Sequence, residues 1–168
     1  RPNYEANILW QKGHCLRWRG NLPEARQVYE RAYGLFQTPE LRSEPAAHSK
    51  GFDLAEVHFA AGDVSKEFTV LAEIEVVARG FDVDLTIAEC LYLKGWLYFQ
   101  LGDFVGAERE LQAAVQHAEK EFGESHIAFI YPAYQLAQTY EARGRQEKSH
   151  ELCGRLRRVT QRFVDLPY

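Results

Sequence analysis

Residues 91–114 read LYLKGWLYFQLGDFVGAERELQAA, and this stretch decides the fold because its pattern recurs along the chain. Its central glycine has counterparts at steps of 42, 40 and 42 residues, which gives the series Gly20, Gly62, Gly102 and Gly144. A small residue stands seven positions before each glycine, at Gly13, Ala55, Gly95 and Ala137. A large apolar residue or cysteine stands nine positions after it, at Tyr29, Leu71, Leu111 and Cys153. Self-similarity at a fixed period of this length indicates a repeat protein.

Apolar spacing and turn residues predict two helices in each repeat. The predicted helices cover residues 4–19, 23–37, 46–61, 64–79, 84–101, 104–121, 125–143 and 146–163. Pro23 suits the first turn of its helix. Pro132 conflicts with a helix interior, so its helix either begins near Ile130 or is kinked. Residues 69–77 are rich in β-branched side chains, but we expect the repeat period to outweigh this local preference.

The third repeat carries the clearest copy of the pattern and resembles the tetratricopeptide repeat. The matching positions are Leu91, Gly95, Tyr98, the turn Gly102-Asp103-Phe104, Ala107, Leu111 and Ala114. The segment Phe122-Gly123-Glu124-Ser125-His126 is similar to the longer kinesin-light-chain-type variant, and the resemblance covers about residues 6 to 160. It implies an all-α, right-handed α-solenoid of about four antiparallel helix pairs. The repeats would be about 4–38, 46–79, 84–121 and 125–163, within a single domain over residues 1–168.

The second repeat departs from this pattern at two packing positions. Glu67 stands where the pattern has alanine, and His58 stands where it has tyrosine. An unpaired buried carboxylate costs several kcal/mol. We therefore expect either a hydrogen bond between Glu67 and His58 or a splayed helix pair.

Composition and charge narrow the class of protein. The 168 residues are 46% hydrophobic and 26% charged, as is typical of globular proteins. The formal net charge of −4 provides no overall basic field for nucleic acid. The longest apolar stretch, residues 87–101, is interrupted by Glu89 and Lys94 and is too short to cross a bilayer. We expect neither nucleic-acid binding nor membrane insertion, and the oligomeric state stays open.

Cysteine and methionine usage bears on the cellular setting. Cys15, Cys90 and Cys153 are odd in number and far apart in sequence, which favours buried free thiols in a reducing, cytoplasmic compartment. No signal peptide is visible. The chain has no methionine, so we expect it to be a fragment of a longer protein.

Catalytic motifs are missing from the sequence. It has no Gly-rich phosphate loop, no Gly-x-Ser-x-Gly elbow, no His-Glu-x-x-His and no Cys-x-x-Cys. Asp82 and Asp84 could hold a divalent cation, although Asp84 as the N-cap of the next helix is the simpler interpretation. His14 and Cys15 are adjacent and therefore point in different directions on a helix, and His126 is expected to cap a turn. We expect no enzyme activity, no cofactor and no metal.

A second stripe of side chains on the first helix of each pair is the candidate partner-binding surface. In the resemblance, these helices line the concave side of the solenoid, and their residues outside the packing positions are unusually aromatic. The candidates are Trp10, His14, Trp18, Phe52, Phe59, Tyr92, Trp96, Phe99, Tyr131 and Tyr134. Two interpretations stay open: the rings pack between adjacent repeats, or they line a groove for a peptide or helix. Tyrosine and tryptophan are enriched at interaction hot spots.

Two basic residues occupy places that normally hold core leucines. Lys12 and Lys94 stand eight positions before Gly20 and Gly102, respectively. We expect their stems to pack while their ammonium groups either snorkel to solvent or pair with carboxylates of the next helix. They are not expected to form the carboxylate clamp known in the family.

The sequence favours a protein–protein interaction scaffold that binds a peptide or helix of a partner. The alternative is a regulatory or sensor module of a signalling or transcription-control protein. A closed apolar pocket with convergent polar groups would favour the sensor, and an open groove the scaffold.

Overall fold

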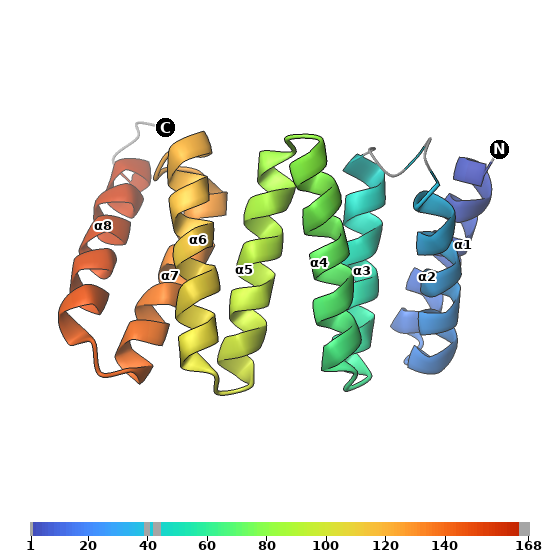
Figure 1. Cartoon of the computed structure of the whole chain (residues 1–168), viewed down its shortest axis with the longest axis horizontal. Coiled ribbons are helices and arrows are strands. Elements are labelled where there is room, and N and C mark those ends of the chain that lie inside the picture. The colour runs from blue at the N-terminus through green and yellow to red at the C-terminus, as the bar shows by residue number, and fades with distance from the viewer. Residues whose placement is uncertain (1, 39–40, 42–44, 165–168) are drawn as a thin grey trace. The chain divides into compact units, whose positions relative to one another are not determined.

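The computed structural model describes residues 2–38, 41 and 45–164. Among these residues it contains eight α-helices and no β-strand (Figure 1). Their bounds are α1 (Pro2–Trp18), α2 (Leu22–Phe36), α3 (Pro45–Ala60), α4 (Val64–Gly80), α5 (Asp84–Gln100), α6 (Phe104–Phe122), α7 (Ile127–Ala142) and α8 (Gln146–Val164). Each predicted helix is present, with ends within two residues of the predicted ones. The all-α fold of four helix pairs is therefore confirmed, including the β-branched segment that lies in α4.

The tight turns inside the helix pairs follow directly from the repeated glycine. Gly20, Gly62, Gly102 and Gly144 have φ angles of +76°, +77°, +77° and +70°. This left-handed conformation costs glycine little because it lacks a Cβ atom. In the first three turns the next residue is Asn21, Asp63 or Asp103, whose side chain accepts a hydrogen bond from a backbone N–H three residues later. One dipeptide thus both reverses the chain and starts the second helix.

Close crossing of the two helices in a pair depends on the small residue before the turn. A Cβ atom added to Gly13 would lie 2.6 Å from the ring of Tyr29, and one added to Gly95 would lie 2.6 Å from Cγ of Leu111. These contacts join the position seven before the turn glycine to the position nine after it. The structure therefore gives a steric reason for both members of the repeated pattern.

Replacing Ala107 with leucine is expected to lower the free energy of unfolding by about 1–3 kcal/mol, because overpacking strains a filled core. Ala107 is fully buried in α6. Val105→Leu, at an exposed position of the same helix, should change the free energy by less than about 0.5 kcal/mol. Urea denaturation of both variants measures the difference. Equal midpoints would contradict the alignment of the third repeat.

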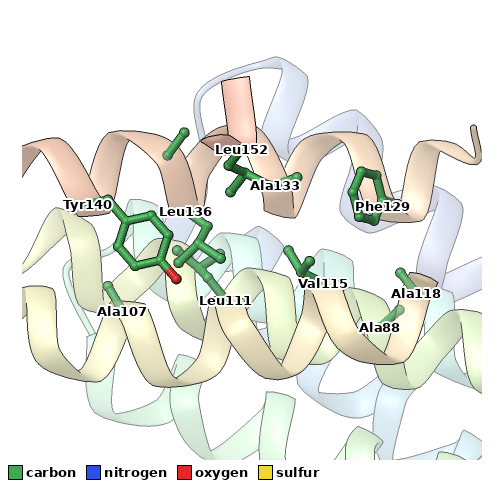
Figure 2. Packing of buried hydrophobic residues seen from close by; sticks show 11 residues of the cluster. Ala88, Ala107, Leu111, Val115, Ala118, Phe129, Ala133, Leu136, Tyr140 and Leu152 are labelled. Carbon is green, nitrogen blue, oxygen red and sulfur yellow. The ribbon is translucent and has the colours of Figure 1, made fainter. Parts of the chain in front are cut away.

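The residue contacts divide the chain into two compact units, Arg1–Asp82 and Val83–Tyr168. The first contains α1–α4, where Trp10 packs against Tyr29 with their ring centroids 4.4 Å apart. The second contains α5–α8, whose core includes Ala88 of α5, Leu111 of α6, Phe129 of α7 and Leu152 of α8 (Figure 2). The segment between α2 and α3 belongs to the first unit, and its residues 39–40 and 42–44 lie outside the described residues. The second unit contains the site described below.

Two local predictions about the second unit need correction. α7 begins at Ile127 and contains Pro132 in its second turn, so the proposed start near Ile130 is wrong. Asp84 is the first residue of α5, and the N-cap is Val83, which makes no side-chain cap bond. The helix thus starts one position earlier than an N-cap at Asp84 would give, directly after the left-handed turn residue Asp82, whose φ is +53°.

The burial expected for Cys15 is wrong. Of the two alternatives for Glu67 and His58, the hydrogen bond is not formed, and the splayed helix pair stays a prediction. Cys15 is an exposed free thiol, whereas Cys90 is buried and Cys153 is half-buried; Cys15 lies on a face of α1 that its repeat does not cover. Glu67 and His58 are both buried, but no hydrogen bond joins them, and Oε2 of Glu67 has no hydrogen-bond partner. The nearest carboxylate to His58 is that of Glu30, 3.9 Å away.

The predicted lysine pairs and the histidine cap are confirmed. Lys12 lies 3.3 Å from Glu24, and Lys94 lies 3.2 Å from Glu110, in each case on the second helix of the same pair. The Nδ1 atom of His126 accepts a hydrogen bond from the backbone N–H of Ala128 at the start of α7. Each contact fixes a helix to its neighbour or to its turn.

Candidate functional site

A groove between α5 and α7 is the candidate functional site, and both helices belong to the second unit. Its volume is about 430 Å³, within the usual range for ligand-binding pockets. The lining residues are Leu85, Ala88, Glu89, Tyr92, Ile127, Ala128, Tyr131 and Pro132. α5 and α7 are the first helices of the third and fourth pairs and contact each other directly.

Helical periodicity explains why these side chains share one groove. On α5 the lining residues are spaced three, four and seven positions from Leu85, so they form one face of the helix. On α7 they repeat after four residues. Two alanines, Ala88 and Ala128, stand between larger exposed side chains such as Leu85 and Ile127. Short side chains between long ones leave a hollow where the two helices meet.

Two tyrosines face each other across the groove. The rings of Tyr92 on α5 and Tyr131 on α7 are stacked, with centroids 6.5 Å apart and an interplanar angle of 22°. Burial raises the pKa of the Tyr92 hydroxyl, with a smaller contribution from Tyr131. The pair therefore presents aromatic surface that is partly withdrawn from water.

Glu89 is the single formally charged residue among the eight that line the groove. It retains solvent-exposed area, yet the apolar walls around it displace water, and this desolvation raises the pKa of its carboxyl group. The groove is thus apolar with one acidic group at its side.

Pro132 adds a backbone feature to the α7 wall. Proline has no N–H, so it cannot donate the helical hydrogen bond to the carbonyl oxygen of Ala128. Both residues line the groove. This wall therefore has a carbonyl group that lacks its usual helical donor.

The predicted partner-binding residues of the second unit separate into different environments. Tyr92 and Tyr131 line the groove. Phe99 packs against Phe104 of its own helix pair, with ring centroids 5.4 Å apart, and Trp96 is half-buried outside the groove. Tyr134 is 57% exposed on α7, where its hydroxyl accepts a hydrogen bond from Gln138.

The predicted residues of the first unit also differ from one another. Trp10 is only 2% exposed, and Lys50 lies over its ring at 4.9 Å. Trp18 is 95% exposed at the end of α1. His14, Phe52 and Phe59 are half-buried. Burial removes Trp10 from the accessible surface, whereas Trp18 stands free of the core.

Sequence reasoning missed six of the eight lining residues, including Leu85, Glu89, Ile127 and Pro132. The available signal was the spacing of Leu85, Ala88, Glu89 and Tyr92, in which a small residue separates larger ones on one helical face. Glu89 was noted only as a break in an apolar stretch. Its location in a groove depends on α7, about 40 residues away in sequence.

A second hollow of about 380 Å³ lies against α6, α7 and α8. Several of its charged and polar groups already have partners: Arg155 pairs with Glu119, Lys148 lies over Tyr140, and Gln112 donates to the hydroxyl of Tyr140. A ligand would have to displace these contacts, so we favour the α5/α7 groove.

The described residues hold no group of three or more His, Cys, Asp or Glu side chains that could bind a metal ion. None of the helices in the same part of the chain is both long and apolar enough to cross a membrane.

Residues 88–120 match the tetratricopeptide repeat family. This match spans most of α5 and α6, where the sequence pattern is clearest. This segment is similar to a tetratricopeptide repeat. Its resemblance to this family is thereby confirmed in the third repeat. The sequence matches none of the curated proteins.

Solved structures share the helical fold at low sequence identity. BtubC (BKLC) from P. vanneervenii aligns with a TM-score of 0.84 and 16% identity, covering 100% of this chain and 68% of that one. The apo form of RapI aligns at 0.81 with 12% identity, over 96% of this chain and 44% of that one. A Rap protein complexed with competence and sporulation factor aligns at 0.78 with 18% identity, over 98% and 45%. The chain spans less than half of both Rap-type structures, and identities this low establish the fold alone.

Proposed function

We propose that the chain is a protein-interaction module whose α5/α7 groove receives an apolar segment of a protein partner. The observation that carries this proposal is the exposed apolar surface around the groove, to which Leu85, Ile127 and Tyr131 contribute. Contiguous exposed apolar surface of this kind marks interaction sites. Tetratricopeptide-type arrays also present extended surfaces suited to binding other proteins.

The groove dimensions indicate what kind of segment fits. The lining residues of α5 run from Leu85 to Tyr92, a distance of about 10 Å along a helix. A segment of about two helical turns spans this length, and it would place apolar anchors three or four residues apart. An amphipathic helix or a short extended peptide meets this description. The proposed module needs no catalytic group of its own.

A regulatory or sensor module is the second candidate function. The Rap protein solved in complex with competence and sporulation factor shares the fold of this chain, so a fold of this kind is compatible with binding such a factor. Such a module would use the same groove and transmit the bound state to other parts of a longer protein. Binding of a short ligand that alters hydrogen exchange in helices beyond α5 and α7 would favour it over the scaffold.

Two tyrosines on one helix provide a matched test of the groove. Tyr131 and Tyr134 are 56% and 57% exposed on α7, but of the two only Tyr131 lines the groove. A photo-crosslinking amino acid at position 131 identifies the partner. Tyr131→Ala is then expected to weaken binding of that partner by about 2 kcal/mol, roughly 30-fold, as for a central anchor. Tyr134→Ala should change it by less than about 0.5 kcal/mol.

Binding is measured by isothermal titration calorimetry, and circular dichroism verifies that each variant is folded. If Tyr131→Ala binds as tightly as wild type, the groove is not the docking site. If Tyr134→Ala loses as much affinity as Tyr131→Ala, the contact surface is the broader aromatic stripe rather than the groove.

A further inference from the structure

Glu89 is exposed at the side of the groove, and unlike the buried and half-buried acidic groups of the second unit it has no partner. Glu108 pairs with Arg143 and Arg145, and Glu110 pairs with Lys94. Glu89 forms no hydrogen bond or ion pair with any residue that the structure describes. An acidic group beside an apolar groove is therefore left available for a group from outside.

We propose that the α5/α7 groove selects a cationic segment: the partner places one lysine or arginine side chain on Glu89, and the stem of that side chain lies against Tyr92 and Tyr131. This inference rests on the proposed function of the groove and specifies the chemistry of its occupant. The occupant is a segment of a protein partner with a single basic residue between apolar ones.

Charge complementarity is the first argument for a basic occupant. No lysine, arginine or histidine lines the groove, so a cation meets no repulsion from the walls. A carboxylate of the partner would instead face Glu89 in surroundings that already penalise charge. A basic side chain stabilises the ionised form of Glu89, whereas an acidic one opposes it.

Aromatic surface is the second argument. A cation over a tyrosine ring is attracted by the negative face of the ring. The protein itself uses this contact: Lys148 lies over Tyr140 at 5.5 Å, and Arg155 over Phe129 at 5.1 Å. The stacked Tyr92 and Tyr131 rings offer the same surface within the groove, but no cation of the described residues is recorded over either ring.

The position of Glu89 between apolar side chains predicts the pattern of the occupant. Leu85 lies one turn before Glu89 on α5, and Ile127 and Pro132 line the opposite wall. These three side chains suit apolar anchors of the partner. The bound segment should therefore carry a lysine or arginine three or four residues from a large apolar residue.

Selection from a display library of helix-forming peptides, with one face randomised, tests this pattern on the whole chain. Wild-type protein is expected to enrich peptides that combine one basic residue with apolar residues three or four positions away. The tightest selected peptide is then synthesised in two forms, with its basic residue intact or replaced by norleucine. Affinities of both forms are measured for wild type, Glu89→Gln and the control Glu147→Gln, which alters an exposed acid on α8.

Glu89→Gln and the norleucine replacement are each expected to weaken binding at least tenfold. Made together, they should weaken it little more than either alone, because both remove the same contact. Glu147→Gln should leave the affinity unchanged. NMR titration of labelled glutamate gives an independent readout: the pKa of the Glu89 carboxyl should fall when the basic peptide binds.

The possible outcomes separate this inference from the proposed function. If selected peptides lack a basic residue, or bind Glu89→Gln as tightly as wild type, while Tyr131→Ala abolishes their binding, the groove is a docking site but not one for cations. If no peptide is selected, or if Tyr131→Ala has no effect on those that are, both the cation inference and the groove proposal are overturned.

Discussion

Phe129→Ala is expected to lower the free energy of unfolding by about 3–5 kcal/mol, the range for truncating a fully buried aromatic side chain. Phe129 has no exposed surface and belongs to the same core cluster as Ala88 of α5 and Ala118 of α6 (Figure 2). Both of these neighbours are alanines, whose short side chains cannot extend to fill the space that the ring leaves. The resulting cavity adds to the loss of burial.

Tyr131→Ala is the matched control because it removes an exposed ring two residues further along α7. We expect it to lower the free energy of unfolding by less than about 0.5 kcal/mol. The two variants should therefore show opposite profiles: Phe129→Ala loses stability, and Tyr131→Ala loses partner binding.

Guanidinium denaturation measures the stability of both variants, and hydrogen–deuterium exchange locates the loss. Each repeat of such an array contacts its neighbours, so protection after Phe129→Ala should fall in α5–α8 more than in α1 and α2. A uniform loss of protection along the chain, or a change of less than 1 kcal/mol, would show that Phe129 does not hold α7 on the core.

The helix pairs were predictable because their turns are encoded locally. Each turn glycine adopts a positive φ, and in three of the turns the following Asn or Asp caps the second helix. The small residue before the turn and the large one after it, as in Gly95 and Leu111, meet within one pair. All of these contacts join residues less than 20 positions apart. A single-sequence pattern is sufficient to detect them.

The groove was less predictable because it depends on contacts between pairs. α5 is apolar on more than one face, and sequence alone does not tell which face meets α7. The stripe of Tyr92, Trp96 and Phe99 shares only Tyr92 with the groove. The ion pairs of Glu108 with Arg143 and Arg145 also join different helix pairs. The repeat pattern contains no signal that predicts them. The groove and these ion pairs both depend on packing between residues that are far apart in sequence.

The second repeat shows how a residue that breaks the pattern can persist. Glu67 is 5% exposed in α4, yet the expected hydrogen bond to His58 is not formed. Burial, with a smaller contribution from the like charge of Glu56, raises the pKa of Glu67 from 4.5 to about 7. The carboxyl group is therefore largely protonated in mildly acidic solution, where it avoids most of the cost of a buried charge.

Because the pKa of Glu67 is raised, the free energy of unfolding depends on pH in a direction that can be predicted. Between pH 4.5 and 7 the folded state holds the Glu67 proton while the unfolded state releases it. The free energy of unfolding therefore falls as the pH rises through this window. The stabilising contribution of the proton on Glu67 is present in full below about pH 4.5. A shift of this size corresponds to about 3 kcal/mol.

Glu67→Ala removes this titration and restores the alanine found at the equivalent positions Ala25 and Ala107. We expect the free energy of unfolding of Glu67→Ala, relative to wild type, to rise by about 3 kcal/mol between pH 4 and pH 8. At pH 4 the variant is destabilised relative to wild type by losing the packing of the Glu67 side chain. At pH 8 it is stabilised relative to wild type because it buries no carboxylate.

Urea denaturation at intervals between pH 4 and pH 8 measures this difference, with Glu73→Ala, at an exposed position of the same helix, as the control for losing one acidic residue. Burial also raises the pKa of Asp53 and lowers that of His58. Both groups are present in all three proteins, so subtracting the wild-type curve removes their contributions. A difference for Glu67→Ala that stays constant from pH 4 to pH 8, or that follows the Glu73→Ala curve, would show that Glu67 is ionised throughout and that α4 opens to solvate it.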